Sequence, residues 1–226
     1  MKKRTVSLAL FLIPFTIYGQ EFFLNADLVS KYMWRGMKNG NAAIQPYVGF
    51  QIENFTFTAW GSTEFRRRNN EIDLIVEYEH RNWTFSLMNV FFQEEGERFR
   101  YFHYSPRTTG HTLEAGAAYT LSPYFPLQAA WYTTFAGNDY TENGHRLWST
   151  YWEFLLPFTI GKIGLEAEAG ISPWKGMYTD QFAVNNLALT AGWDWKATKK
   201  FTLTPFAKIG YNPFEKDFYG VIGITL

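Results

Sequence analysis

Apolar and polar residues alternate with a period of two along nearly the whole chain, which is typical of strands with two unlike faces. The last nine residues show this pattern most clearly. One face of that segment carries Phe218, Gly220, Ile222, Ile224 and Leu226, and the other carries Tyr219, Val221, Gly223 and Thr225. The pattern predicts an all-β chain whose last strand has an apolar outward face and runs to the final residue.

The alternation divides the chain into about twelve strands separated by turn residues. The first strand is expected over residues 24–35, and the second is expected to end near Glu53. The other strands are expected to start near Phe55, Ile72, Trp83, His111, Leu127, Gly144, Ile160, Ala183, Phe201 and Phe218. Twelve spans of about ten residues each fit within residues 21–226.

Residues 1–20 have the composition of a secretory signal peptide. Three basic residues at positions 2–4 precede an apolar stretch at 5–17, which is too short to span a membrane as a helix. Removal of this segment lowers 21 basic residues to 18 against 21 acidic residues, a net charge of −3. Such a weak charge excludes a strongly basic nucleic-acid-binding protein. The absence of cysteine excludes a disulfide scaffold and a thiolate metal site.

Aromatic residues make up 20% of the chain, with 9 Trp, 14 Tyr and 22 Phe. In membrane barrels, Trp and Tyr concentrate at both lipid–water boundaries. The mean hydropathy is −0.24, and no mature segment has the long apolar run of a membrane-spanning helix. These features predict a single antiparallel transmembrane β-barrel over residues 21–226, in the outer membrane of a Gram-negative envelope. A soluble β-sandwich would also alternate, but it would not explain charges confined to one face of nearly every strand.

The topology follows from the position of the chain ends. Bacterial single-chain barrels have an even number of strands, because both chain ends lie in the periplasm. When strands are counted from each chain end, the two counts assign the same connections to the outer side only if residues 83–110 form one strand and one long outer loop. The other expected outer loops are residues 36–42, 66–70, 136–144, 172–182 and 212–217, and the expected periplasmic turns include 122–126, 157–159 and 196–200.

Four short motifs occur in order in the first half of the chain. They are Leu28-Val29-Ser30-Lys31-Tyr32-Met33-Trp34-Arg35-Gly36, Ala43-Ile44-Gln45, Trp60-Gly61-Ser62 and Glu71-Ile72-Asp73-Leu74. Together they resemble the opening strands of the TorF family of porins, over about residues 24–120. The chain departs from the family at Ala42, where proline is common. The resemblance implies an outer-membrane barrel of the porin type.

Charged residues are expected on the inward faces of the strands, because a charge facing lipid costs about 2–4 kcal/mol at the midplane. The expected inward acids are Asp27, Glu53, Glu64, Asp73, Glu77, Glu79, Glu114, Glu153, Glu166, Glu168 and Asp194. The expected inward bases are Lys31, Arg35, Lys162 and Lys208. An acidic excess would attract cations and repel anions if water fills the lumen. In the alternative, these charges pair with one another and fill a narrow interior.

Two groups of charged residues suggest specific contacts near the outer end. Arg35 and Glu64 lie on the first and third expected strands, about 10 Å apart by strand spacing. They would form either a bidentate pair or two separate solvated rim charges. Arg66, Arg67 and Arg68 lie on an expected outer loop, where they would contact lipopolysaccharide phosphates or remain solvated.

Enzymatic residues are not indicated. None of the histidines, at positions 80, 103, 111 and 145, lies in a hydrolase motif. A metal site built from His103, His111 and Glu114 has no diagnostic spacing. We therefore predict no enzyme and no cofactor, with a barrel lipid hydrolase as the least favoured alternative. The loop at 93–110 would either fold inward as a constriction or extend the barrel wall.

The expected function is a porin-like channel in the cell outer membrane, for passive diffusion of small hydrophilic solutes or cations through an acidic lumen. A non-conducting structural or adhesion barrel is the alternative. The expected partners are outer-membrane lipid, lipopolysaccharide and the barrel-assembly machinery, which would bind Phe218–Leu226. The last residue is Leu226, where most barrels end in an aromatic residue.

Overall fold

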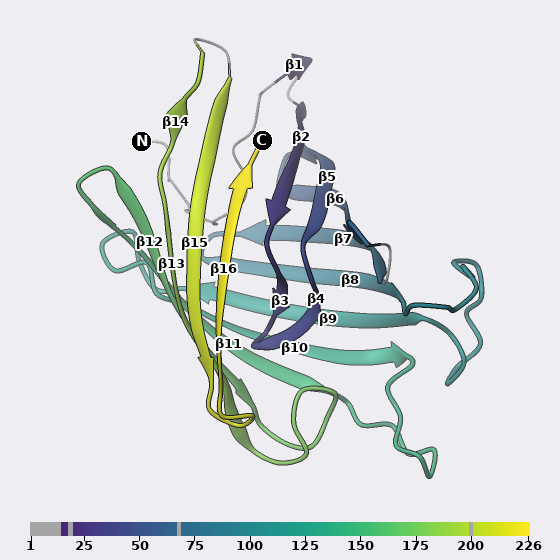
Figure 1. Cartoon of the computed structure of the whole chain (residues 1–226). Coiled ribbons are helices and arrows are strands. Elements are labelled where there is room, and N and C mark those ends of the chain that lie inside the picture. Colours follow the sequence, from purple (N-terminus) through teal and green to yellow (C-terminus); the bar gives the residue numbers. More distant parts are fainter. Residues whose placement is uncertain (1–14, 18–19, 67–68, 199–200) are drawn as a thin grey trace.

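The computed structural model describes residues 15–17, 20–66, 69–198 and 201–226. These residues form a closed antiparallel β-barrel of twelve long strands, as the alternation predicts (Figure 1). None of the described residues belongs to a helix that is long and apolar enough to cross a membrane. Most of the predicted signal peptide lies outside the described residues, so it stays a prediction.

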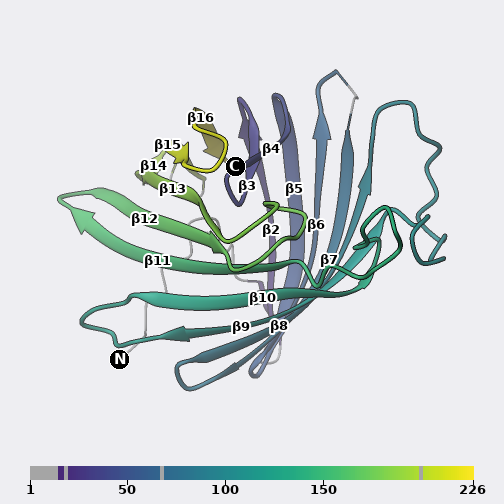
Figure 2. The ribbon, with the colours of Figure 1, turned by 90° about the horizontal axis from the view of Figure 1, so that it is seen from below.

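Each barrel strand pairs with the next one along the chain, and β16 pairs with β2 to close the barrel (Figure 2). The barrel strands are β2 (Gln20–Val29), β5 (Ala43–Ile52), β6 (Phe55–Glu64), β7 (Asn70–His80), β8 (Trp83–Gln93), β9 (His111–Thr120), β10 (Gln128–Gly137), β11 (Thr150–Ile160), β12 (Ile163–Ser172), β13 (Ala183–Gly192), β15 (Thr202–Asn212) and β16 (Asp217–Thr225). The short strands are β1 (Phe15–Ile17), β3 (Tyr32–Trp34), β4 (Met37–Gly40) and β14 (Trp195–Lys196).

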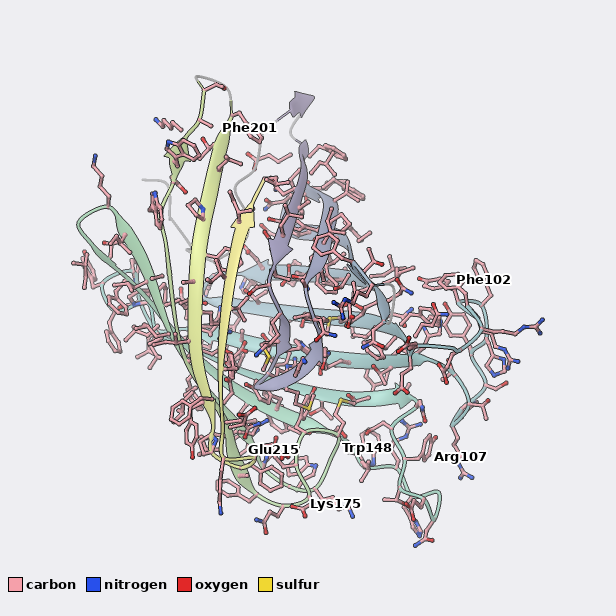
Figure 3. All side chains as sticks on the ribbon, viewed as in Figure 1. Phe102, Arg107, Trp148, Lys175, Phe201 and Glu215 are labelled. Atoms are coloured by element: carbon pink, nitrogen blue, oxygen red, sulfur yellow. The ribbon has the colours of Figure 1, made fainter. Side chains whose placement is uncertain are left out.

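The two ends of the barrel differ in the length of their connections. The long loops that carry Arg107, Trp148 and Lys175 lie at one end, together with the short turn of Glu215, whereas Phe201 lies at the opposite end (Figure 3). We call the first the outer end and the second the periplasmic end. As predicted, residues 83–110 form one strand, β8, and one long outer loop.

The outward face of the strands is apolar and exposed. Leu87 on β8, Ile209 on β15 and Ile222 on β16 are 56%, 65% and 72% exposed. An exposed apolar surface of this kind is stable when it faces lipid. Near the periplasmic turns this face carries a series of ring contacts, which join Phe50 with Phe57, Phe55 with Tyr78, and Trp83 with Tyr119 at centroid distances of 5.0, 4.8 and 4.9 Å. The series matches the aromatic girdle that the composition predicts.

Two strand boundaries differ from the sequence-based prediction. The expected turn at 157–159 is wrong, because Pro157 lies inside β11, opposite Glu166. The chain turns instead at residues 161–162, where Gly161 adopts a φ of 62° that suits glycine. The strand expected from Gly144 starts at Thr150, since Asp139 accepts hydrogen bonds from the amide and hydroxyl of Ser149 and holds the preceding loop.

The first barrel strand is shorter than predicted. β2 ends at Val29, and residues 30–42 leave the wall as the hairpin β3–β4 (Figure 1). The closing seam between β2 and β16 therefore has three register pairs, from Gly223–Val29 to Thr225–Asp27. The hydroxyl of Thr225 adds a hydrogen bond of 2.6 Å to Asp27 across the seam.

Candidate functional site

The hairpin β3–β4 folds into the barrel and reaches the far wall. Its two turn residues, Arg35 and Gly36, have φ angles of 51° and 79°, as a two-residue hairpin turn requires. A Cβ on Gly36 would lie 2.0 Å from the carbonyl oxygen of Asn185, so only glycine fits at the tip. The hairpin starts between β2 and β5, whereas its tip contacts β9, β10 and β11 on the opposite side of the strand order.

Arg35 joins the tip to the wall through an ion pair. Its guanidinium donates two hydrogen bonds to Glu114 on β9, at 2.5 and 2.7 Å. It also donates to the hydroxyl of Tyr178, from the loop between β12 and β13, and that hydroxyl lies 3.4 Å from Glu114. Burial raises the pKa of Tyr178 well above its ordinary value, so the phenol stays neutral. The geometry is the two-pronged form that makes arginine–carboxylate pairs strong.

Aromatic rings surround the Arg35 guanidinium on its remaining sides. Its central carbon lies 4.6, 4.4, 4.9 and 5.5 Å from the ring centroids of Trp34, Tyr132, Tyr151 and Tyr178. Cation–π attraction of this kind grows when water is excluded, and Arg35 is only 8% exposed. Two asparagines complete the attachment, since the side-chain nitrogens of Asn185 and Asn212 donate to the backbone carbonyls of Arg35 and Gly36.

Glu64 binds the segment that follows β4 and leads back to the wall. Its carboxylate accepts hydrogen bonds from the backbone and side-chain nitrogens of Asn41, at 3.0 and 3.2 Å, and from the side chain of Asn69 at 3.3 Å. Both alternatives for Arg35 and Glu64 are therefore wrong, because the two side chains do not pair and neither is solvated at the rim. The hairpin carries Arg35 across the lumen to Glu114. The two residues are 79 positions apart in the sequence, so no local pattern predicts their contact.

Most of the predicted lumen residues face the interior, where carboxylates outnumber bases. Glu168 pairs with Lys208 at 2.5 Å and accepts a hydrogen bond from Asn186, which in turn accepts one from Tyr219. The described inward carboxylates of the long strands are Asp27, Glu64, Glu71, Asp73, Glu77, Glu114, Glu153, Glu166 and Glu168. Glu71 was missing from the sequence-based set, although it shares a strand face with Asp73.

The other predicted lumen residues lie in turns or near the ends of strands. Glu53 and Lys162 are in exposed turns, so their expected inward position is wrong. Asp194 is exposed beyond the end of β13 and accepts a hydrogen bond from Thr204 at 3.0 Å. Glu79 is exposed near the periplasmic end, and Lys31 is half-buried between β2 and β3. A selectivity role for any of these residues stays a prediction.

The loop of residues 94–110 packs on the outward face of β8 and β9 near their outer ends and extends beyond them (Figure 1), so it does not fold inward as a constriction. Its Tyr104 stacks on His111 at 4.2 Å, and its Phe99 meets Phe91 at 5.4 Å. His111 and Phe91 form a register pair on the outward face of β9 and β8. Phe102, which is 89% exposed, projects from the same loop (Figure 3).

The possible metal site of His103, His111 and Glu114 is wrong. His111 faces outward, Glu114 faces the lumen, and His103 contacts the hydroxyl of Thr108 at 3.0 Å. Within the described ranges, no three His, Cys, Asp or Glu side chains come together as metal ligands. Of the three arginines expected to contact phosphate, Arg66 is exposed, and positions 67–68 lie outside the described residues.

Comparisons with known proteins found similarity among solved structures alone. Scans against models of protein families and searches of curated proteins found no match. Among solved structures, the chain resembles one described as "Unveiling the Mechanism Behind the in-meso Crystallization of Membrane Proteins". The identity is 10%, over 93% of this chain and 83% of that chain, with a TM-score of 0.50. It is also similar to "KdgM porin", with 7% identity over 91% and 97% of the two chains and a TM-score of 0.49. At these identities the first likeness supports the fold alone.

The tip glycine provides a direct test of the hairpin geometry. We expect Gly36→Ala to undock the tip, because alanine in the left-handed region costs about 1–2 kcal/mol and its Cβ would overlap the Asn185 carbonyl. Limited trypsin digestion of the folded barrel, read by mass spectrometry, should then show cleavage after Arg35. Gly96→Ala, at a positive φ with open space around it, is the matched control and should leave Arg35 protected.

Proposed function

We propose that this protein is a porin-type channel of the outer membrane, in which the β3–β4 hairpin forms the constriction. Small hydrophilic solutes or cations would diffuse through an acidic lumen past this hairpin. The single observation that carries the proposal is the bidentate Arg35–Glu114 pair, which holds a loop across the inside of a barrel with an apolar exterior. Membership of the TorF family, which the four sequence motifs suggest, is part of the same proposal.

The charge of the lumen supports a preference for cations. Glu77, Glu153 and Glu166 face the interior, and no inward base of the described wall forms an ion pair of 4 Å or less with them. Arg35 and Lys208 are engaged by Glu114 and Glu168. Unbalanced carboxylates in a narrow, low-dielectric passage concentrate cations and repel anions.

A non-conducting structural barrel is the second candidate. The observation that favours it is the close packing around the hairpin tip, where Arg35 lies among four rings and Tyr151 is fully buried. In that case the hairpin would be a permanent plug that stabilises the barrel. Catalysis has no comparable support, since the site contains no nucleophile beside a histidine base among the described residues.

Recordings in planar bilayers distinguish the two candidates. We expect the refolded barrel, shown to be folded by its heat-dependent gel mobility, to give discrete current steps and a cation-biased reversal potential under a KCl gradient. Current steps without cation bias would contradict the acidic-lumen proposal. Silence from a folded barrel would favour the structural candidate.

Neutralisation of three lumen carboxylates should change that potential. We expect the combined variant Glu77→Gln, Glu166→Gln and Glu168→Gln to lose most of the cation preference, because it removes three negative charges and leaves Lys208 unpaired. The reversal potential measures this directly. Glu215→Gln, on an exposed outer loop, is the control and should leave the potential unchanged. An unchanged potential in the triple variant would reject selectivity by these residues.

A further inference from the structure

We infer that Glu71 and Asp73 form a binding site for a divalent, oxygen-preferring cation such as Ca²⁺, beside the hairpin on the inner face of β7. The two residues are two positions apart on one strand, so their side chains share a face. They are only 3% and 6% exposed. One oxygen of each, Oε2 of Glu71 and Oδ1 of Asp73, is fully buried and has no hydrogen-bond partner. Both unsatisfied atoms therefore belong to adjacent acids in one enclosed region.

No base is available to neutralise this pair within the described structure. In the sheet register, Glu71 lies between Ser62 and Phe92, and Asp73 lies between Trp60 and Val90, so every flanking residue is uncharged. Among the bases of the hairpin, Arg35 is held by Glu114, whereas Lys31 is half-buried, Lys38 is exposed, and neither lysine forms an ion pair with Glu71 or Asp73. Lys208 is held by Glu168.

Neutral oxygen atoms lie beside the two acids. The phenol of Tyr32, from the hairpin, lies beside Glu71. The hydroxyl of Ser62 accepts a hydrogen bond from Gln45 at 3.3 Å and keeps a free lone pair. Tyr32, Ser62 and Glu71 also line a crevice with Asn69 and Asn70 that is too narrow to hold a water molecule. The site thus offers two carboxylates and two neutral oxygens.

The chemistry of these groups favours a hard divalent cation. Two buried carboxylates without a partner are costly unless a cation or a proton compensates them. Carboxylate, hydroxyl and phenol oxygens suit Ca²⁺, which accepts irregular geometry, better than Mg²⁺, which retains several waters. This site has only two acids, and its other two oxygens come from a phenol and a hydroxyl, so it is not a cluster of three or more acids or histidines, which the described residues lack.

A cation here would act on the constriction. Tyr32 belongs to the hairpin and stacks on Trp60 of the wall at a centroid distance of 5.6 Å. An ion bound by Glu71 and Asp73 would therefore join the hairpin to β7, two strands along the wall from β9, which carries Glu114. This consequence rests on the proposed function, whereas binding itself is measured without current. Absence of channel current would not contradict cation binding, and absence of cation binding would not contradict channel activity.

Terbium luminescence tests the site in the refolded full barrel in detergent. Tb³⁺ replaces Ca²⁺ and emits when a nearby indole is excited, and Trp60 is the register partner of Asp73. We expect saturable Tb³⁺ emission that Ca²⁺ displaces. The double variant Glu71→Gln, Asp73→Asn should weaken Tb³⁺ binding more than tenfold. Glu166→Gln, a lumen carboxylate on β12, is the matched control and should bind as the wild type does.

A second measurement separates binding from a folding defect or an optical effect. Trp60→Phe should remove the sensitised emission, whereas calorimetry should still detect Ca²⁺ binding. Gel mobility confirms that each variant is folded. Emission that persists in the folded double variant would overturn the inference. Absence of Ca²⁺ binding by calorimetry at neutral and mildly alkaline pH would also overturn it, and would mean that protons alone compensate the two acids.

Discussion

Replacement of residues 31–41 by a short glycine–serine linker is expected to raise the single-channel conductance several-fold. The hairpin crosses the lumen from the β2–β5 side to β9, β10 and β11, so its removal clears the outer half of the passage. The barrel should still close, because β2 and β5 pair directly from Gln20–Ile52 to Val29–Ala43. A linker of about two to five residues therefore joins the two strands as an ordinary hairpin loop.

A second loop deletion is the control for this experiment. Shortening of residues 94–110 removes a similar length of chain from the outside of the barrel, where Tyr104 and Phe99 pack on outward-facing residues. We expect it to leave the conductance unchanged. Equal conductance of the hairpin deletion and the wild type would place the constriction elsewhere in the lumen. Equal effects of the two deletions would indicate a general disturbance of the barrel.

The barrel itself could be predicted from the sequence because its cause is local. A strand between lipid and lumen must alternate, and the burial of β16 does so from Phe218 to Thr225, as does that of β7 from Ile72 to Glu77. Parity then required one long loop at 83–110, and the structure contains it. Turn positions were harder to predict, because proline usually interrupts strand pairing and yet Pro46, Pro157 and Pro205 lie within β5, β11 and β15.

The constriction could not be predicted in the same way. Residues 32–40 alternate like a wall strand, so the pattern continued the first strand to Arg35 although the chain leaves the wall at Ser30. Two local signals were present. The expected strand exceeded the usual span of about ten residues, and the Arg35-Gly36 pair resembles the X-Gly turn of a two-residue hairpin. The partner, Glu114, depends on how far that hairpin reaches, which no local pattern records.

The inward course of the hairpin also affects the closing seam. Because the chain leaves the wall after Val29, β16 pairs with β2 only from Gly223 to Thr225. Further bonds support the seam, from the amide of Ser30 to the carbonyl of Ile222 and from the amide of Leu226 to the carbonyl of Ala26. The departure of the chain from the wall at Ser30 thus affects both the attachment of the hairpin to the far wall and the closure of the barrel.

Removal of one partner from the Arg35–Glu114 pair should open the constriction. Glu114→Ala leaves a buried guanidinium without its carboxylate, a change that typically costs about 3–5 kcal/mol. The hairpin can escape this cost by moving into water, so we expect the barrel to stay folded while the hairpin undocks. Hydrogen exchange of the hairpin amides measures this opening, which should rise by roughly two to four powers of ten if the full cost falls on docking.

A double-mutant cycle shows whether the two residues act as one unit. Arg35→Ala should also release the hairpin, and adding Glu114→Ala should increase the opening little further, because the interaction is already lost. Arg35→Lys should have an intermediate effect, since lysine keeps the charge but loses the planar fork and the stacking on Tyr132 and Tyr151. Additive effects of the two alanine variants would show that each side chain acts separately.

The matched pair Glu168→Ala and Lys208→Ala, which lies on the wall away from the tip, should leave hairpin exchange unchanged. Coupling confined to the first pair would therefore show that Arg35 and Glu114 together hold the constriction closed. Among the described residues, theirs is the only ion pair that joins the hairpin tip to the opposite wall.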